Sequence, residues 1–334
     1  MFDILCIGDA KVDIFIKIPQ INSHFGFDKE KNQLLITLGE KISVDRYIVS
    51  TGGNATNTAI GISRLGFNTG VFAEIGKDEF SQKIINKLKK ENINTNLLLQ
   101  NDKEKTSLSV ILTYNKERTI LSEHIERNHE FNFYGLETKF IYLTSLGNFW
   151  ENAYEKTLEF VTKNNLQLAF NPGTLQIEKR DKLIMDIIEK TDFLFVNKEE
   201  AEELLYGKEL GIEIQDDKSL VKKLLFGLKS LGAKNVIITD SQNGSYLQDE
   251  KNDNYHLGIL KEEVVEKTGA GDSYTAGFLA AILNGLLITD AMVWGTLNAT
   301  SVVGKTGAQE GLLKKSEMLE KIKSLKNFTP EKLT

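Results

Sequence analysis

Residues 268–285 read TGAGDSYTAGFLAAILNG. The glycines on either side of Ala270 let the backbone turn tightly and approach a ligand without a Cβ in the way. The apolar run 273–284 predicts a helix directly after this turn, and the free N–H groups at its start point towards one spot. Such a spot suits an anion, for example a phosphoryl group in transfer.

Asp272 lies at this predicted helix start. Its carboxylate is ionised at pH 7 and can accept a proton from a substrate hydroxyl. Aspartate is a weak base, but phosphoryl transfer has a loose transition state and requires little of its base. The alternative interpretation is that Asp272 is an ordinary helix N-cap.

A second glycine-rich segment, residues 51–57, reads TGGNATN and opens a predicted helix of small residues over 54–65. The adjacent glycines Gly52 and Gly53 allow close contact with a polyhydroxy ligand. Asn57, one turn into the helix, can both donate and accept hydrogen bonds. Taken alone, the segment can equally be a tight turn with an asparagine as local cap.

Much of the remaining chain alternates short apolar strands with helices. This alternation predicts a parallel α/β sheet with helices on both faces. In such folds ligands bind beyond the carboxyl ends of the strands. The predicted strands lie at 2–8, 71–75, 140–146, 168–170, 193–196 and 236–239.

Three segments do not have the pattern of a buried parallel strand. Residues 12–18 alternate with period two, which is typical of a half-exposed strand, and residues 33–50 and 106–125 also read as extended. We expect them to form a small separate sheet. Placed at the ligand-binding edge, that sheet would act as a lid on a single domain spanning 1–334, with the α/β core formed by the remainder.

Composition excludes several classes of protein. With 41 basic and 47 acidic residues the net charge is −6, which argues against nucleic acid as the main partner. The single cysteine, Cys6, allows neither a disulfide within the chain nor a Cys-based zinc site. No apolar stretch approaches 18 residues and the N-terminus has no basic leader, so we expect no membrane association and a cytoplasmic location.

The two glycine-rich segments together resemble the signatures of the PfkB family of carbohydrate kinases, in the ribokinase-like superfamily. Residues 52–76 are similar to the N-terminal signature and residues 268–285 to the C-terminal one. The resemblance implies a ribokinase-like α/β core with a small β-sheet lid. It also implies ATP-dependent phosphorylation of a hydroxyl group on a sugar or sugar-like small molecule.

The resemblance assigns roles to residues of both signatures and of the predicted lid. It makes Asp272 the catalytic base. The backbone N–H groups of Gly269, Ala270 and Gly271 would form the anion hole, and the substrate would be bound by Asp13, Gly52, Gly53 and Asn57.

The nucleotide and metal sites follow from two further motifs. Residues 197–200, NKEE, match the family's N-x-x-E pattern, so Asn197 and Glu200 are implied to organise Mg²⁺ through water. Residues 239–244, TDSQNG, resemble a T-x-G-x-x-G loop in which serine replaces the middle glycine. The implied nucleotide-binding residues are Thr239, Ser241, Gly244, Thr296, Asn298 and Gly307.

Other departures from the family pattern concern potassium and the acceptor. Members activated by a monovalent cation often carry Asp-Thr-Thr before the glycines, whereas this chain has Glu266-Lys267-Thr268, so Glu266 is a candidate potassium ligand with a lysine beside it. Lys11 replaces an asparagine and Gly147 a glutamate that ribokinases tend to have, which argues against ribose. Lys11 and Arg118 either meet a phosphate on the acceptor or are exposed lid charges.

Three functions remain open at this point. Sugar kinases and nucleoside kinases share both signatures, so either kind of small molecule can be the acceptor. A catalytically silent sugar or nucleotide sensor on the same fold is the third, but the presence of Asp272, Asn197 and Glu200 favours an active kinase. Some relatives dimerise by pairing lids, and the extended pattern of 33–50 allows such a homodimer.

Overall fold

The computed structural model describes residues 1–19, 24–31, 33–114, 117–123, 125–207 and 216–333. Its largest element is a ten-stranded sheet, in the order β16-β15-β14-β13-β12-β11-β10-β1-β6-β7. The strands from β7 to β13 are parallel, and β14 to β16 continue one edge antiparallel. The parallel strands are β1 Ile4–Ile7, β6 Thr69–Gly76, β7 Leu98–Asn101, β10 Phe140–Thr144, β11 Gln167–Asn171, β12 Phe193–Asn197 and β13 Asn235–Thr239.

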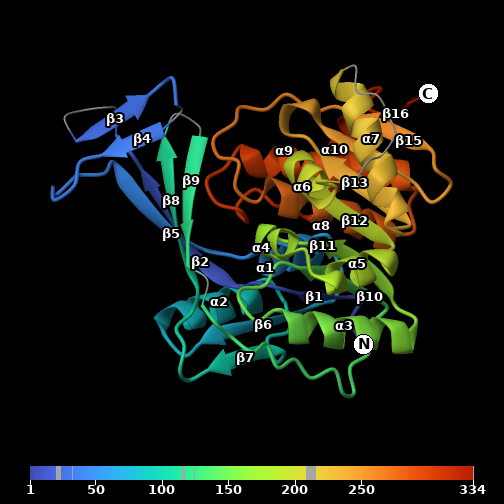
Figure 1. Cartoon of the computed structure of the whole chain (residues 1–334), viewed down its shortest axis with the longest axis horizontal. Coiled ribbons are helices and arrows are strands. Elements are labelled where there is room, and N and C mark those ends of the chain that lie inside the picture. Colours follow the sequence, from blue (N-terminus) through green and yellow to red (C-terminus); the bar gives the residue numbers. More distant parts are fainter. Residues whose placement is uncertain (20–23, 32, 115–116, 124, 208–215, 334) are drawn as a thin grey trace.

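Helices cover both faces of this sheet, as the alternation of apolar segments predicted (Figure 1). Successive strand residues divide between two cores: Cys6 packs on one face, and Leu5 and Ile7 on the other. One core includes α1 Asn54–Arg64, α2 Glu79–Lys90, α8 Ala270–Leu283, α9 Ile288–Val303 and α10 Lys315–Ser324. The other includes α3 Glu151–Asn164, α4 Thr174–Lys179, α5 Lys182–Glu189, α6 Lys198–Leu204 and α7 Asp217–Ser230.

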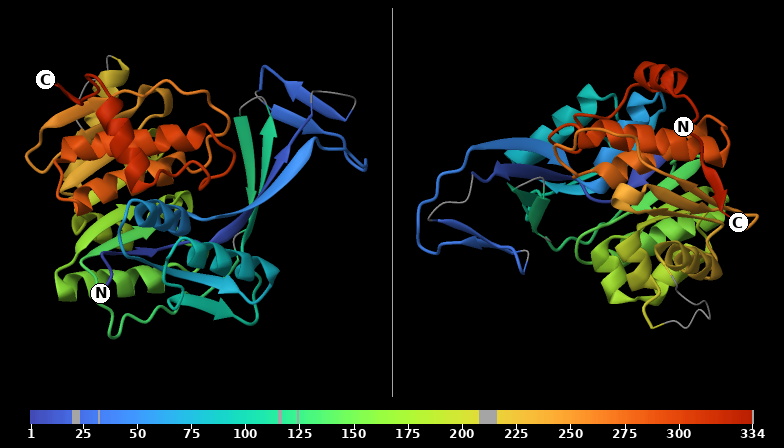
Figure 2. Two further views of the ribbon diagram at one scale, coloured as in Figure 1. Left: turned by 180° about the vertical axis from the view of Figure 1, so that it is seen from behind. Right: turned by 90° about the horizontal axis from the view of Figure 1, so that it is seen from above.

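A second, four-stranded sheet projects to one side of the layered body (Figures 1 and 2). Its order is β5-β2-β8-β9, with β2 parallel to β8 and antiparallel to β5. Its strands are β2 Lys11–Lys17, β5 Arg46–Gly52, β8 Leu108–Tyr114 and β9 Glu117–Ser122. Of the predicted extended segment 106–125, residues 115, 116 and 124 lie outside the described residues.

The predicted extended segment 33–50 divides between two sheets. Its C-terminal part forms β5, whereas β4 Gln33–Ile36 pairs with β3 Phe25–Asp28 in a separate two-stranded sheet. The Asp28 carboxylate accepts hydrogen bonds from the backbone N–H groups of Glu30 and Lys31 and thereby stabilises the turn after β3. This hairpin lies at the outer end of the four-stranded sheet (Figure 2).

The antiparallel edge of the large sheet was not predicted from the sequence. It consists of β14 Ser245–Gln248, β15 Asn254–Leu257 and β16 Glu331–Leu333, three strands of three or four residues each. Such short segments carry too little period-two pattern to stand out from loops.

Among the residues that the structure describes, no helix is both long and apolar enough to cross a membrane.

Candidate active site

A pocket of about 320 Å³ lies between the carboxyl edge of the large sheet and the four-stranded sheet. Its walls come from the start of α1, the N-terminus of α8, the ends of β11, β12 and β13, and the strands β2, β8 and β9. It therefore occupies the position where open α/β sheets bind ligands. Of the predicted site residues, it brings together Asp13, Gly53, Asn57, Asn197, Glu200, Thr239 and the run Gly269, Ala270, Gly271 and Asp272.

The N-terminus of α8 forms an open cradle on the pocket wall. Gly269 has φ +80°, and a Cβ there would lie 2.4 Å from the Cβ of Ala308, so only glycine fits. At Gly271 a Cβ would meet nothing within 4 Å. The first i→i−4 hydrogen bond of α8 runs from the Ser273 N–H to the Gly269 carbonyl. The N–H groups of Gly271 and Asp272 precede this bond, so they have no i→i−4 partner within the helix. The cradle fits a phosphate group.

Asp272 occupies the first turn of α8 and lines the pocket. Its Oδ2 accepts a 2.8 Å hydrogen bond from Nδ2 of Asn57. Burial raises the pKa of Asp272 to about 6, with the Asn57 bond acting in the opposite direction. The carboxylate is therefore ionised at neutral pH and is more basic than a free aspartate, as a general base requires.

Asp13 in β2 is 5% exposed and its pKa is also raised to about 6 by burial, with Lys11 acting in the opposite direction. Gly52 in the adjacent strand makes room for it: a Cβ at Gly52 would lie 1.9 Å from the Asp13 Oδ2. Gly53, with φ +99°, connects β5 to α1, and a Cβ there would lie 2.3 Å from the Asp9 carbonyl oxygen. Both glycines are therefore required by close approach.

Asn197 and Glu200 form a reciprocal cap at the start of α6. The Glu200 N–H donates to Asn197 Oδ1 at 2.7 Å, and the Asn197 N–H donates to Glu200 Oε2 at 2.9 Å. Burial raises the pKa of Glu200 to about 7. No cluster of three or more His, Cys, Asp or Glu residues in the described ranges is arranged to hold a metal. A single carboxylate and an amide fit Mg²⁺, which binds largely through phosphate and water.

Glu266 is buried just before the glycine turn. Its Oε1 accepts bonds from the Thr268 N–H at 2.7 Å and from the Thr268 hydroxyl at 2.5 Å. Its Oε2 is buried without a hydrogen-bond partner among the described residues. A buried carboxylate oxygen in this state is a site for a cation or a water molecule.

The predicted nucleotide residues do not all line this pocket. Thr239 lines the pocket at the end of β13, while Ser241, Gly244, Thr296, Asn298 and Gly307 do not. Asn298 is buried in α9, where its Nδ2 donates to the Ser273 carbonyl and its Oδ1 accepts from the Leu313 N–H. These two bonds join α9 to α8 and to the following loop. A nucleotide contact by Asn298 stays a prediction.

The turn after β13 shows how serine is accommodated at position 241, where the T-x-G-x-x-G pattern has glycine. Ser241 has φ +46°, in the left-handed region that favours glycine, and Gly244 has φ +87°. A Cβ at Gly244 would lie 2.1 Å from the Leu257 carbonyl oxygen, an impossible contact. Serine is therefore tolerated at 241 at the cost of backbone strain, while Gly244 is obligatory.

We therefore expect opposite effects of two substitutions in this turn. Ser241→Gly relieves the strain and should raise the free energy of unfolding by up to about 1 kcal/mol. Gly244→Ala should lower it by about 2 kcal/mol or more, because backbone must move. Urea unfolding of both variants measures this, and a destabilised Ser241→Gly protein would contradict the strain argument.

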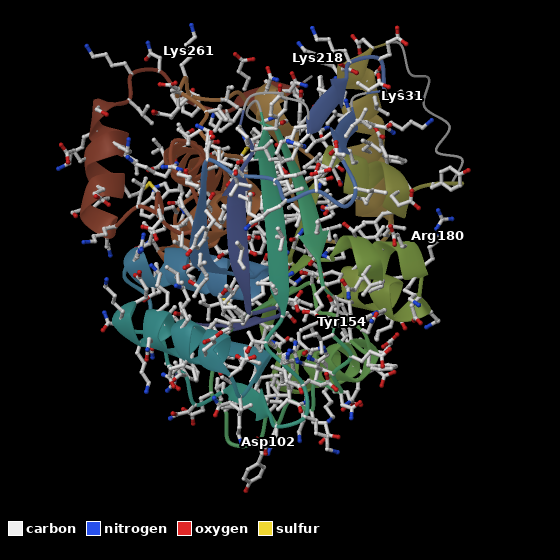
Figure 3. All side chains as sticks on the ribbon, turned by 90° about the vertical axis from the view of Figure 1, so that its left-hand side faces the viewer. Lys31, Asp102, Tyr154, Arg180, Lys218 and Lys261 are labelled. Carbon is white, nitrogen blue, oxygen red and sulfur yellow. The ribbon has the colours of Figure 1, made fainter. Side chains whose placement is uncertain are left out.

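On the pocket face of the four-stranded sheet, the sequence singled out Asp13, Lys11 and Arg118 but missed the side chains between them. Ser109 pairs with Ser122 across β8 and β9, with 3.3 Å between their hydroxyl oxygens, and Ile111 pairs with Ile120 one step outward. All four line the pocket, as do Lys11 and Arg118. The strands of this sheet cross the middle of Figure 3.

Comparison with known families and proteins gives consistent matches. A family model described as pfkB family carbohydrate kinase matches residues 17–315. A nucleoside kinase of Methanocaldococcus jannaschii is 32% identical over 160 residues, 48% of each chain. A ribokinase of Haemophilus influenzae is 27% identical over 166 residues, 50% of each chain. The match thus spans about half the length of these curated relatives.

Solved structures match over nearly the whole chain. The crystal structure of the M. jannaschii nucleoside kinase aligns with a TM-score of 0.75 at 25% identity, covering 97% of this chain and 99% of that one. A ribokinase from Thermotoga maritima aligns with a TM-score of 0.77 at 22% identity, covering 97% and 100%. These similarities confirm the predicted ribokinase-like fold.

Proposed function

The chain belongs to the pfkB family of carbohydrate kinases, and from that premise we propose that it transfers the γ-phosphoryl group of ATP to a hydroxyl group of a sugar or sugar-like small molecule. The observation that carries the proposal is the position of Asp272. Its carboxylate lies beside the open cradle of α8, in one pocket with Asp13 and Asn57. Base, anion site and substrate-facing polar groups thus share one space.

In the proposed reaction the groups of the site have distinct roles. Asp13 and Asn57 accept and donate hydrogen bonds to the acceptor and orient the reacting hydroxyl towards Asp272. The Asp272 carboxylate takes the hydroxyl proton as the oxygen forms its bond to phosphorus and the bond to the leaving ADP oxygen breaks. The N–H groups at the start of α8 hold the transferring group by hydrogen bonds to its oxygens. Closure of the four-stranded sheet excludes water, a competing acceptor.

Asn197 and Glu200 are the residues that would hold Mg²⁺, through water and the nucleotide phosphates. The ion would supply positive charge that offsets the charge of the phosphoryl oxygens. Glu200 lines the pocket, and Asp272 raises its pKa further, so the two carboxylates share one electrostatic environment.

A nucleoside is the second candidate acceptor, favoured by the pocket face of the four-stranded sheet. Asp13 pairs with Ser109, and Arg118 pairs with Thr113, four residues further along β8 or roughly 13 Å. Between them lie Ile111 and Ile120. A nucleoside would place its ribose at Asp13, its flat base on the isoleucines and acceptor atoms of the base edge near Arg118.

The test is ADP release from Mg-ATP with a panel of acceptors: fructose, ribose, other ketoses and aldoses, fructose phosphates, adenosine, cytidine and inosine. Turnover on one of them supports the kinase and fixes its acceptor class. ATP binding without turnover on any acceptor would instead favour a silent sensor on this fold.

We propose in addition that Glu266 binds potassium through its unpartnered Oε2. The expected result is that KCl accelerates turnover relative to an equal concentration of LiCl, and that Glu266→Gln removes most of this acceleration. Glu263→Gln, an exposed change in the same loop, is the matched control. Equal rates in both salts would contradict the assignment.

A homodimer through the four-stranded sheet and its hairpin is the proposed assembly. Large apolar side chains are exposed there, with Leu38 94%, Tyr47 69% and Leu121 56% exposed. Burying such a patch against a second copy would remove it from water. Light scattering after size-exclusion chromatography tests this, and a monomer at micromolar concentration would contradict it.

A further inference from the structure

Asn57, which the sequence assigned to the acceptor, is also the last link of a buried chain of hydrogen bonds. The Thr51 hydroxyl donates to Oε1 of Gln309, Nε2 of Gln309 donates to Oδ1 of Asn57, and Nδ2 of Asn57 donates to Oδ2 of Asp272. Each bond is 2.8 Å long. Thr51, Gln309 and Asn57 are 6%, 3% and 3% exposed.

The direction of this chain follows from its chemistry. An ionised carboxylate only accepts hydrogen bonds, so Asn57 must present its NH₂ group to Asp272. Its oxygen then faces Gln309, which must in turn present its own NH₂ group. The remaining Gln309 oxygen accepts the Thr51 hydroxyl. Turning the Asn57 amide over would place its NH₂ group against the NH₂ group of Gln309 and its oxygen against the Asp272 carboxylate, which costs free energy.

The backbone that carries Gln309 is itself fixed. Nη1 of Arg64 donates to the carbonyl oxygens of Gln309 and Leu312, at 2.8 and 3.0 Å. The same guanidinium makes a bidentate ion pair with Glu91, with hydrogen bonds of 2.9 and 2.7 Å. The loop between α9 and α10 is therefore anchored on α1, the helix that carries Asn57.

We propose that Gln309 is a positioning residue: it locks the amide of Asn57 so that its N–H donates to Asp272, and thereby keeps the base oriented and ionised for the transfer. The proposal rests on the proposed kinase function only for its kinetic consequence. Its structural content concerns Asp272 alone, so it can be tested without knowing the acceptor.

The test substitutes Gln309 without changing its volume much. Gln309→Met removes both hydrogen bonds, and Gln309→Glu keeps the shape but replaces the donor by an acceptor. In both variants Asn57 loses the restraint on its amide, and donation to Asp272 weakens. Since a hydrogen bond to the charged form lowers a carboxyl pKa, we expect the titration midpoint of Asp272 to rise.

The readout is a ¹³C NMR titration of the Asp272 carboxyl group in the ligand-free protein, with Asp272→Asn used to assign the signal. We expect a rise of about half a pH unit or more in Gln309→Met. The charged or titratable groups that act on Asp272 or share its surroundings remain in all variants: Asp13, Lys11, Tyr142, Glu200 and Lys267. Glu310→Gln, next in the chain and mostly exposed, should leave the midpoint unchanged.

Kinetics give the second readout, with Mg-ATP and whichever of adenosine or fructose proves to be phosphorylated. Gln309→Met should lower kcat about tenfold, with the KM for ATP unchanged and the acidic limb of the profile moved to higher pH. In an Asn57→Ala background the same substitution should have little further effect, because Gln309 acts through Asn57.

An unchanged Asp272 midpoint in a folded Gln309→Met protein would overturn the proposal, even if stability fell. Should that variant fail to fold, Thr51→Val removes the hydroxyl at the far end of the chain and leaves Gln309 in place. It should raise the midpoint in the same direction by a smaller amount, and no rise would again count against the assignment. If the Asp272 midpoint shifts in a protein that phosphorylates no acceptor, the role of Gln309 is supported and the proposed kinase function is contradicted.

Discussion

Asp272→Asn is expected to lower kcat by at least about a hundredfold while the protein stays folded. A general base contributes at least that factor, and an amide cannot take the hydroxyl proton at neutral pH. The amide oxygen can still accept the bond from Asn57, so the local packing is kept. Steady-state kinetics on the acceptor found by the panel measure the loss. In the wild type, the rate should fall below about pH 6, where Asp272 protonates.

Although kcat falls, the free energy of unfolding of Asp272→Asn should rise. A carboxylate whose pKa is raised by burial costs stability when it is ionised, so its unfavourable contribution is present above about pH 6 and absent below about pH 4. Asp272→Asn removes that contribution. We expect the free energy of unfolding to rise by about 1 to 3 kcal/mol at pH 8 and to match the wild type near pH 4.

A matched control separates the base from a general effect of charge removal. Asp290 occupies the first turn of α9 as Asp272 occupies the first turn of α8, but it is exposed and lies outside the pocket. Asp290→Asn should leave kcat unchanged. Near-normal turnover in Asp272→Asn, or an equal loss in Asp290→Asn, would remove Asp272 from its proposed role.

Gly52→Ala is expected to reduce kcat/KM for the acceptor between about tenfold and a hundredfold, with the KM for ATP little changed. The added Cβ would lie 1.9 Å from Oδ2 of Asp13, so the carboxylate must leave its position. A hydrogen bond to a charged group contributes about 1.5 to 3 kcal/mol, which sets the size of the expected loss. Titration calorimetry with the acceptor would register it as weaker binding.

Gly258→Ala is the control for this substitution, since a Cβ there meets nothing within 4 Å and its φ lies outside the left-handed region. Asp13→Asn should reproduce the loss of Gly52→Ala. If Gly52→Ala left acceptor binding intact while Asp13→Asn abolished it, the carboxylate would have another position from which it binds equally well.

The sequence predicted those elements whose structure depends on neighbouring residues in the chain. The buried strands and the glycine turn at 269–271 follow from apolar runs and from the need for positive φ. Hydrogen bonds between distant residues could not be predicted in this way. Asn57 and Asp272 are 215 residues apart, and Thr51 and Gln309 are 258 apart. Each of these polar residues, read alone, is as compatible with an exposed loop as with a buried network.

The four-stranded sheet shows the same limit. Period two in residues 12–18 predicted a strand, but which strands pair, and in which register, depends on packing that the pattern does not contain. Hence the Ser109–Ser122 pair was missed, although both strands lie within the predicted segment. The segment 33–50 was predicted as one extended unit, although Gly39, with φ +79° in the turn after β4, marks the break between Gln33–Ile36 and the strand that follows.

The connection between β5 and α1 couples the four-stranded sheet directly to the helix that carries Asn57. β5 ends at Gly52 and α1 begins at Asn54, so one residue, Gly53, separates the outer sheet from the helix that carries Asn57. A linker of one residue has no slack, and its backbone is confined to a conformation that only glycine adopts readily. Any tilt of β5 as the sheet engages an acceptor is transmitted to the first turn of α1. In the proposed reaction, binding of the acceptor and alignment of Asp272 are thereby coupled to each other.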